Sequence, residues 1–139
     1  MLIKNQSNLG FGLEAIDLKP GTCTNIEIRK SFYEHLPMPF TSCQDLTTYS
    51  SKLYDLFKQI GYEYNQLDCI SMCEQKYIID RCGCYDPVVP NYLTNHSSCL
   101  NSTQQQCMFS SRSQFTDDLV QEECKAKYCP LECNSMSYE

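Results

Sequence analysis

Cysteine content constrains the fold of this sequence more than any other feature. Eleven of the 139 residues are cysteines, a density typical of short chains that disulfides hold together in an oxidising compartment. Three Asn-x-Ser/Thr sequons agree with such a compartment, because their asparagines are candidate N-glycosylation sites: Asn5, Asn95 and Asn101. We therefore expect most of the cysteines to be paired.

The central cysteines lie in a stretch that predicts a helix over residues 66–82. Asn65 is a favourable N-cap at its start, and Gly83 directly after it is typical of a helix end. Cys69 and Cys73 are four residues apart, so they lie on one face of the helix, one turn above the other. Two thiols stacked in this way suit a second element that runs alongside the helix.

A second helix is predicted over residues 113–127, and it can provide that element. Thr116 and Asp117 place a capping residue and an acid near its start, while Lys125 and Lys127 lie near its end. Both arrangements are favourable for the helix dipole. The two helices are expected to run antiparallel to each other.

The N-terminal part of the sequence is predicted to contain strands. Residues 1–14 are polar and are expected to be poorly ordered, and residues 15–18 can form a short strand. From Thr24 onward, apolar and polar residues alternate with a period of two, which predicts a half-buried strand as far as Tyr33.

Three further segments complete the expected secondary structure. Residues 48–60 carry apolar side chains at helical spacing, and both a short amphipathic helix and an irregular loop are open interpretations. Residues 84–107 are rich in Pro, Asn, Ser and Gln and predict a loop. Residues 134–139 are interpreted as the first part of an outgoing strand.

Spacing alone does not determine how ten cysteines pair. If the two helices run antiparallel, however, one ascends while the other descends, and the pairs must nest without crossing. The nested arrangement has five pairs: Cys43 with Cys133, Cys69 with Cys129, Cys73 with Cys124, Cys82 with Cys107, and Cys84 with Cys99. Cys23 is left over, either as a free thiol or with a partner outside the sequence.

Charge and histidine content argue against several classes of function. The net charge is −6 and no Lys/Arg cluster is present, unlike a nucleic-acid-binding surface. A catalytic Cys or Ser needs a nearby base, and His35 and His96 are the only histidines. Cys82 and Cys84 can ligate zinc, but the repeated Cys-x2-Cys pairs of zinc ribbons are absent. We therefore expect no enzyme activity, no cofactor and no metal site.

The sequence contains neither a signal peptide nor a run of about 18 apolar residues. A chain that needs oxidation but carries no export signal is expected to be part of a longer protein. Any membrane contact would then be made by segments outside this sequence.

Three motifs occur together in the chain: Leu36-Pro-Met-Pro-Phe-Thr-Ser-Cys43, then Cys69-x3-Cys73-x8-Cys82-x-Cys84, then Cys124-x4-Cys129-Pro-Leu-Glu-Cys133-x4-Tyr138. Together they resemble the ectodomain of the degenerin/epithelial sodium channel family, which includes acid-sensing and peptide-gated sodium channels. The resemblance covers residues 16–139 and implies the same five disulfide pairs.

The resemblance implies a disulfide-rich α+β fold. Residues 1–41 would form antiparallel strands of the palm and β-ball, residues 42–133 the thumb with its two disulfide-laddered helices, and residues 134–139 the start of the returning palm strand. In a complete subunit of that family, two membrane helices flank the ectodomain, and a homo- or hetero-trimer encloses a pore for sodium ions. The chain would be a fragment on the extracellular side of the plasma membrane.

The same resemblance implies a role for Phe40, which has the position of a family aromatic in the turn between palm and thumb. Pro37 and Pro39 would stiffen this turn. Phe40 would pack on an aromatic at the top of the first membrane helix and transmit thumb movement to the pore. An ordinary core aromatic is the alternative interpretation.

The expected function is therefore a rigid thumb that couples an extracellular stimulus, a ligand or a force, to pore gating. Acid-sensing members carry thumb carboxylates shortly after the position of Cys107, whereas this chain has no acid there before Asp117, so proton gating through that pocket is not expected. The alternative function is a stand-alone secreted disulfide-rich binding module or inhibitor.

Overall fold

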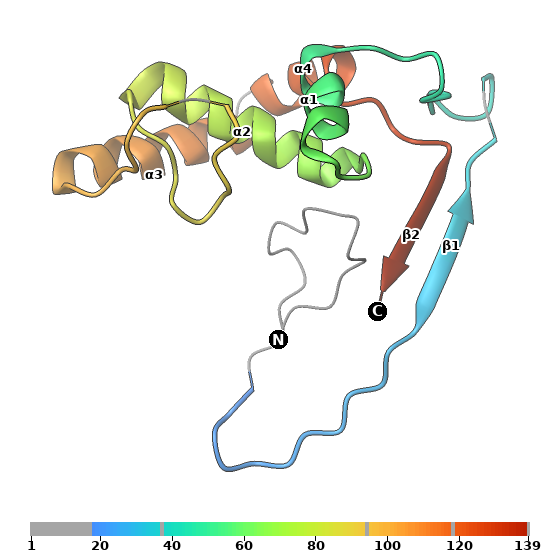
Figure 1. Cartoon of the computed structure of the whole chain (residues 1–139), viewed down its shortest axis with the longest axis horizontal. Coiled ribbons are helices and arrows are strands. Elements are labelled where there is room, and N and C mark those ends of the chain that lie inside the picture. Colours follow the sequence, from blue (N-terminus) through green and yellow to red (C-terminus); the bar gives the residue numbers. More distant parts are fainter. Residues whose placement is uncertain (1–17, 37, 94, 118, 139) are drawn as a thin grey trace.

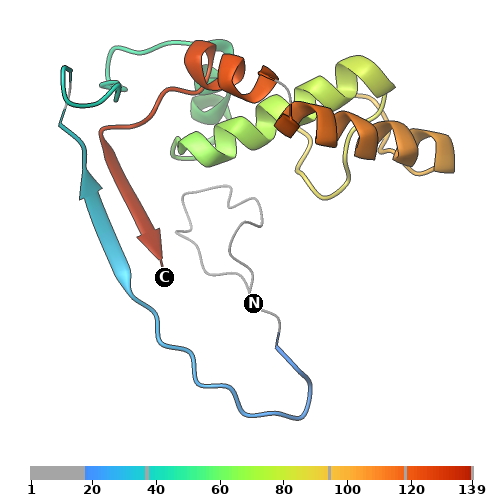
Figure 2. The same cartoon turned by 180° about the vertical axis from the view of Figure 1, so that it is seen from behind.

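A computed structural model describes residues 18–36, 38–93, 95–117 and 119–138, and this part of the chain contains four helices and two strands (Figure 1). In chain order the elements are β1 (Lys30–Glu34), α1 (Lys52–Ile60), α2 (Gln66–Cys82), α3 (Ser102–Asp117), α4 (Val120–Lys127) and β2 (Asn134–Tyr138). The helices pack into one elongated body, the helical unit (residues 43–133), and the two strands extend away from one end of it (Figures 1 and 2). The predicted disulfide-rich α+β fold is confirmed.

Helix α2 is the central element of the helical unit, and it begins and ends where the sequence predicts. The side-chain oxygen of Asn65 accepts hydrogen bonds from the backbone N–H groups of Leu67 and Asp68, at 2.8 and 3.4 Å, and so caps the first turn. Gly83 ends the helix with a φ of 64°, a conformation that is unfavourable for residues with a Cβ atom. Helices α1, α3 and α4 all contact α2.

The prediction of a single helix over residues 113–127 is wrong. Two helices are present, and α3 already begins at Ser102, inside the stretch predicted as a loop. A capping box explains this start: the Asn101 side-chain oxygen accepts from the Gln104 N–H at 2.8 Å, and the Gln104 side chain accepts from the Asn101 N–H at 3.4 Å. The Asn-x-x-Gln signal is present in the sequence, but it is surrounded by polar residues that resemble a loop.

Thr116 does not cap a helix, contrary to the prediction. It lies inside α3, where its hydroxyl donates to the carbonyl oxygen of Ser113 at 2.9 Å. The next helix, α4, follows Leu119 and has no side-chain cap.

The strand predicted over residues 24–33 is shorter than expected. Strand β1 begins only at Lys30, which pairs antiparallel with Tyr138 of β2. Residues 22–29 run beyond the end of this partner strand and are irregular, because no described strand offers them backbone hydrogen bonds. Ile28, expected on a half-buried face, is 49% exposed.

Two other segments adopt the predicted secondary structure. The outgoing strand expected over residues 134–139 is present as β2, and the helical interpretation of residues 48–60 is the correct one. Helix α1 begins later than expected because Ser51 is its N-cap and accepts a hydrogen bond from the Tyr54 N–H at 3.2 Å. The predictions for residues 1–17 lie outside the described residues.

The core of the helical unit contains disulfides as well as apolar side chains. The larger cluster joins all four helices: Leu53, Phe57, Cys69, Ile70, Met72, Phe115, Cys124 and Cys129. A smaller cluster lies between α2, α3 and the loop that connects them: Ile78, Cys84, Cys99 and Met108.

Aromatic rings attach α1 to the segment that precedes α2. The ring of Tyr64 lies edge-to-face against Tyr54 and Phe57, with centroid distances of 5.3 and 5.6 Å. The Tyr64 hydroxyl donates to the carbonyl oxygen of Pro130 at 2.7 Å, so the ring cluster is also tied to the segment after α4. Burial raises the pKa of Tyr64, and its phenol therefore keeps the proton that it donates.

The strands and the helices form two separate bodies. Among the described elements, β1 and β2 contact only each other, and every helix contacts only other helices. In the described part of the chain, the two bodies are therefore connected through the segments that lead from β1 to α1 and from α4 to β2 (Figure 1).

Replacement of Phe57 tests the position of the core. Phe57 is fully buried, so we expect Phe57→Ala to lower the free energy of unfolding by about 3–5 kcal/mol. Thermal unfolding of the oxidised chain followed by circular dichroism measures this loss. Leu100→Ala is the control, because Leu100 is 71% exposed and should change stability by no more than about 0.5 kcal/mol. Equal stability of the two variants would contradict the core described above.

Candidate functional site

Five disulfides form a nested ladder in the helical unit. From the outermost pair inward they join Cys43 to Cys133, Cys69 to Cys129, Cys73 to Cys124, Cys82 to Cys107, and Cys84 to Cys99, with sequence separations that fall from 90 to 15 residues. These are the five pairs of the nested arrangement. Cys23 is exposed and has no disulfide partner among the described residues.

Helix α2 carries three of the ladder's cysteines. Cys69 is bonded to the segment after α4, Cys73 to α4 itself, and Cys82 to α3. At a rise of 1.5 Å per residue, these bonds are distributed over about 20 Å of the helix axis. Neither α3 nor α4 can slide along α2 without breaking a covalent bond, which makes the helical unit stiff along its length.

The zinc interpretation of Cys82 and Cys84 is not compatible with this ladder, because both sulfurs are in disulfides and neither is a thiolate. In the described parts of the chain, His, Cys, Asp and Glu side chains form no group of three or more that could hold a metal ion. No helix found in the described ranges has the length and apolar character needed to cross a membrane.

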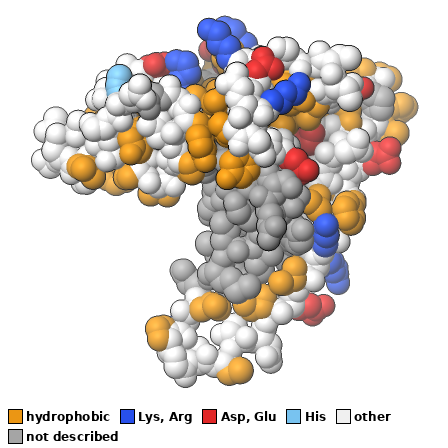
Figure 3. Space-filling view, in the orientation of Figure 1, with side chains coloured by type: hydrophobic (Ala, Val, Ile, Leu, Met, Phe, Trp, Pro, Cys, Tyr) orange, Lys and Arg blue, Asp and Glu red, His pale blue; other side chains and the backbone are white. Residues whose placement is uncertain are grey.

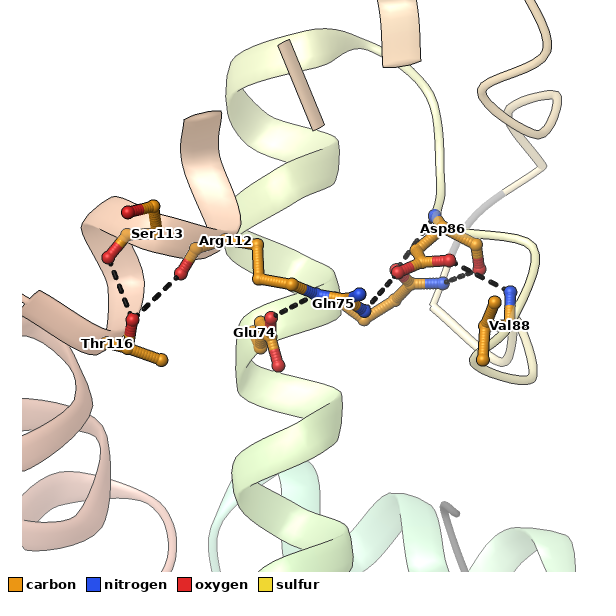
Figure 4. A network of polar contacts seen from close by, with 7 residues as sticks. All are labelled: Glu74, Gln75, Asp86, Val88, Arg112, Ser113 and Thr116. Carbon is orange, nitrogen blue, oxygen red and sulfur yellow. Dashed lines mark hydrogen bonds and ion pairs between the residues drawn. The ribbon is translucent and has the colours of Figure 1, made fainter. Parts of the chain in front are cut away.

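A charged network holds the loop between α2 and α3 against both helices (Figure 4). Arg112 of α3 donates through Nε to Glu74 of α2 at 2.9 Å, and through a terminal nitrogen to Asp86 of the loop. The Asp86 side chain is fully buried, whereas that of Arg112 is 38% exposed. A buried carboxylate is tolerated only with charged or hydrogen-bonding partners, so Arg112 stabilises this position of the loop.

Gln75 of α2 holds the backbone of the same loop (Figure 4). Its buried amide oxygen accepts from the N–H of Asp86 at 3.0 Å, and its amide nitrogen donates to the carbonyl oxygens of Asp86 and Val89, at 3.0 and 3.2 Å. The Asp86 carboxylate also accepts from the N–H of Val88 at 2.9 Å. Polar side chains of two helices therefore fix the loop, in addition to its own disulfide.

Sequence reasoning did not identify this network. Asp86 precedes a proline and is interpreted from the sequence only as part of a loop. Arg112 is a single basic residue within a helix, and its partners Asp86 and Glu74 lie 26 and 38 residues away in the chain. No local pattern in the sequence indicates such partners.

The strands and the helical unit meet at a junction formed by residues 35–44 and 129–133. The disulfide between Cys43 and Cys133 closes it covalently. The His35 N–H donates to the carbonyl oxygen of Cys133 at 2.7 Å, and the N–H of residue 44 donates to that of residue 131 at 2.8 Å. The segment after β1 is thus tied at both its ends to the segment before β2.

Between these two ties the chain forms a short loop that carries Phe40. The hydroxyl of Thr41 donates to the carbonyl oxygen of Leu36 at 2.6 Å and helps to close the loop. Phe40 is 73% exposed, so it is not a core aromatic in the described part of the chain. Pro39 follows a cis peptide bond, and Pro37 lies outside the described residues.

Glu132 is a buried carboxylate at the junction. It is 7% exposed, and one of its oxygens accepts from the backbone N–H of Gln66 at 3.2 Å. Burial raises the pKa of the Glu132 carboxyl group above its ordinary value, while backbone hydrogen bonds and the neighbouring His35 oppose this rise. A cavity of about 540 Å³ opens beside Glu132 and His35.

Two of the three predicted glycosylation sites are exposed. Asn95 lies in the loop between α2 and α3, and Asn101 lies directly before α3. Asn5 lies outside the described residues.

A comparison with protein families identifies the type of protein that contains this ladder and junction. The model of the amiloride-sensitive sodium channel family matches residues 1–139, the whole chain. The chain belongs to this family. Membership of the degenerin/epithelial sodium channel family, predicted from the cysteine motifs, is therefore confirmed.

Similarity to curated proteins agrees with this assignment. The chain is 33% identical over 89 residues to degenerin mec-10 of Caenorhabditis briggsae and 31% identical over 80 residues to the FMRFamide-activated amiloride-sensitive sodium channel of Cornu aspersum. It is 24% identical over 122 residues to epithelial sodium channel subunit beta of Xenopus laevis. These alignments cover 58%, 55% and 86% of the chain, but only 12%, 12% and 18% of the relatives.

The charged network can be tested by removal of its cation. We expect Arg112→Ala to lower the free energy of unfolding by about 1–3 kcal/mol, because it leaves the buried Asp86 carboxylate without its charged partner. The double variant with Asp86→Asn should recover part of this loss. Lys76→Ala is the control, since its ion pair with Asp80 is more than half exposed and contributes little. Denaturant unfolding measures all of these variants, and a loss no greater than that of the control would contradict the network.

Glu132 predicts a specific dependence of stability on pH. A raised pKa means that the folded state binds the proton more tightly than the unfolded state, so stability falls as the pH rises from 4.5 through the raised pKa. Glu132→Gln removes this titration and should be more stable than the parent chain near neutral pH, with a difference that disappears toward pH 4.5. Thermal unfolding across this range measures the difference. The exposed control Glu27→Gln should stay within about 0.5 kcal/mol throughout, and a Glu132→Gln variant without any pH-dependent advantage would contradict the burial argument.

Proposed function

We propose that this chain is an extracellular part of a sodium channel subunit, in which residues 42–133 are the thumb and the strands on either side belong to the palm and β-ball. The thumb acts as a rigid lever that couples an extracellular stimulus, a ligand or a force, to the gating of the pore. The observation that carries this proposal is the combination of a covalently laddered helical unit with a narrow junction.

A lever must be stiff along its length, and it must be joined to the part that it moves at a small site; the helical unit and the junction have these two properties. The three disulfides on α2 prevent the helices from sliding past one another, so a displacement at one end of the helical unit reaches the other end. The strands contact no helix among the described elements, so this displacement passes to them only through the junction.

Phe40 is the residue proposed to receive this movement. Its loop is tied to the segment before β2 by the Cys43–Cys133 disulfide and the His35 hydrogen bond, so the loop moves with the junction. An aromatic side chain that is 73% exposed has apolar surface for another part of the protein to cover. That other part is proposed to be the top of a membrane helix, which lies outside this sequence, and Pro37 and Pro39 are proposed to stiffen the loop.

The assembly and the location of the full-length protein are proposed from its family membership. The epithelial sodium channel relatives are named as subunits, which supports assembly with further subunits, as a homo- or hetero-trimer around a pore for sodium ions. The proposed location of this chain is the extracellular side of the plasma membrane, in agreement with its disulfides. Family membership also supports the expectation that the chain is not an enzyme, and it speaks against a stand-alone secreted binding module.

Replacement of Phe40 in the full-length channel tests the proposal. We expect Phe40→Ala to lower the amiloride-sensitive sodium current per surface channel by about fivefold or more, which corresponds to the loss of a coupling free energy of about 1 kcal/mol. Voltage clamp measures the current, and surface biotinylation measures the number of channels. Phe40→Tyr keeps the aromatic ring and should retain most of the current.

Phe109→Ala is the matched control, because Phe109 is a 59% exposed aromatic on α3, which is not part of the junction. It should leave the current per channel unchanged. Normal currents in Phe40→Ala at normal surface abundance would end the coupling role of this residue, and a full-length protein without any sodium current would end the channel proposal itself.

A further inference from the structure

The two polar atoms of the Asn101 side chain have different surroundings. Its oxygen Oδ1 accepts the N–H of Gln104 at 2.8 Å and caps α3. Its nitrogen Nδ2 has no hydrogen-bond partner in the described part of the chain, and the residue is exposed. Asn101 is also the first residue of the sequon Asn101-Ser102-Thr103, in which all three residues are exposed.

We propose that Asn101 has both functions at once: Oδ1 caps α3, and Nδ2 carries an N-linked glycan. In the attachment step, Nδ2 bonds to carbon C1 of an oligosaccharide carried on a lipid diphosphate, and the proton that Nδ2 loses is released to the solvent. The bond between C1 and the diphosphate oxygen breaks, and the lipid diphosphate leaves with the electron pair. The step needs no oxidant or reductant.

The cap and the glycan are chemically compatible. Glycosylation substitutes the amide nitrogen and leaves the carbonyl oxygen as an acceptor. The second half of the capping box is also independent of Nδ2, because the Gln104 side chain accepts from the backbone N–H groups of Leu100 and Asn101, at 3.3 and 3.4 Å. The helix therefore needs no rearrangement when the sugar is attached.

The position of Asn101 determines which part of the molecule the glycan occupies. The start of α3 lies at the distal end of the helical unit, remote from the strands (Figures 1 and 2). On the face seen in Figure 3, charged side chains are sparse at this end. If the proposed channel function is correct, a bulky hydrated glycan keeps this end in solvent, and other faces of the thumb contact neighbouring parts of the channel.

Three variants of the full-length polypeptide, expressed in mammalian cells, separate the two functions. Thr103→Ala destroys the sequon but keeps the cap, Asn101→Asp keeps a capping oxygen without an acceptor amide, and Asn101→Ala removes both. Electrophoretic mobility with and without peptide N-glycosidase F, together with mass spectrometry of the Asn101 peptide, measures the glycan. All three variants should lose the same increment of one glycan, while the other sequons stay unchanged.

The cap is measured among variants that all lack the glycan. The apparent melting temperature of the surface-labelled protein should be equal for Asn101→Asp and Thr103→Ala and several degrees lower for Asn101→Ala. An unchanged mobility in the three variants would overturn the glycan, and equal melting temperatures for Asn101→Ala and Asn101→Asp would overturn the cap. The mobility assay reads the intracellular pool as well, so it decides the glycan even if a variant fails to reach the surface. Neither mobility nor melting temperature depends on channel current. A negative result for the glycan or the cap is therefore distinct from a negative result for the proposed channel function.

Discussion

The covalent attachment of α2 to its neighbours is the constraint on which the rest of the structure depends. Helices α3 and α4 carry many polar residues, and they place few apolar side chains in the core. Packing alone would hold such helices weakly, because buried apolar area supplies most of the stability of small domains. The disulfides replace part of this missing area, and several of their sulfurs are themselves buried in the two core clusters.

Polar side chains fix the loop between α2 and α3, which its disulfide alone does not hold in one orientation. The cystine between residues 84 and 99 closes the loop between α2 and α3, but a closed loop can still rotate about its base. Gln75 and Arg112 remove this freedom, since each attaches the loop to a different helix. The junction has fewer attachments: a single disulfide and two backbone hydrogen bonds hold it. The apolar side chain of Phe40 is exposed there and does not contribute to a core. The helical unit is therefore stiff throughout, whereas its connection to the strands is thin.

The sequence predicts those features that depend on local chemistry. Asn65 and Gly83 delimit α2, and the spacing of the cysteines indicates the family. The ladder follows from that spacing only when the helices are also taken to run antiparallel. The start of α3 is missed because the Asn101 cap lies in a polar stretch that resembles a loop. The short β1 and the partners of Arg112 depend on residues far away in the chain, which no local pattern specifies. The gating role proposed for Phe40 depends on contacts outside this sequence, so neither the sequence nor the fold specifies it.

The nested order of the disulfides has a consequence for biosynthesis. Cys69 and Cys73 emerge from the ribosome long before Cys129 and Cys124, and they are only four residues apart in the chain. Oxidation in order of appearance would join such neighbours and trap the chain in the wrong connectivity. Cys43, the first cysteine of the ladder, must instead wait for Cys133, the last, so productive maturation requires either delayed oxidation or an isomerase that reshuffles early bonds.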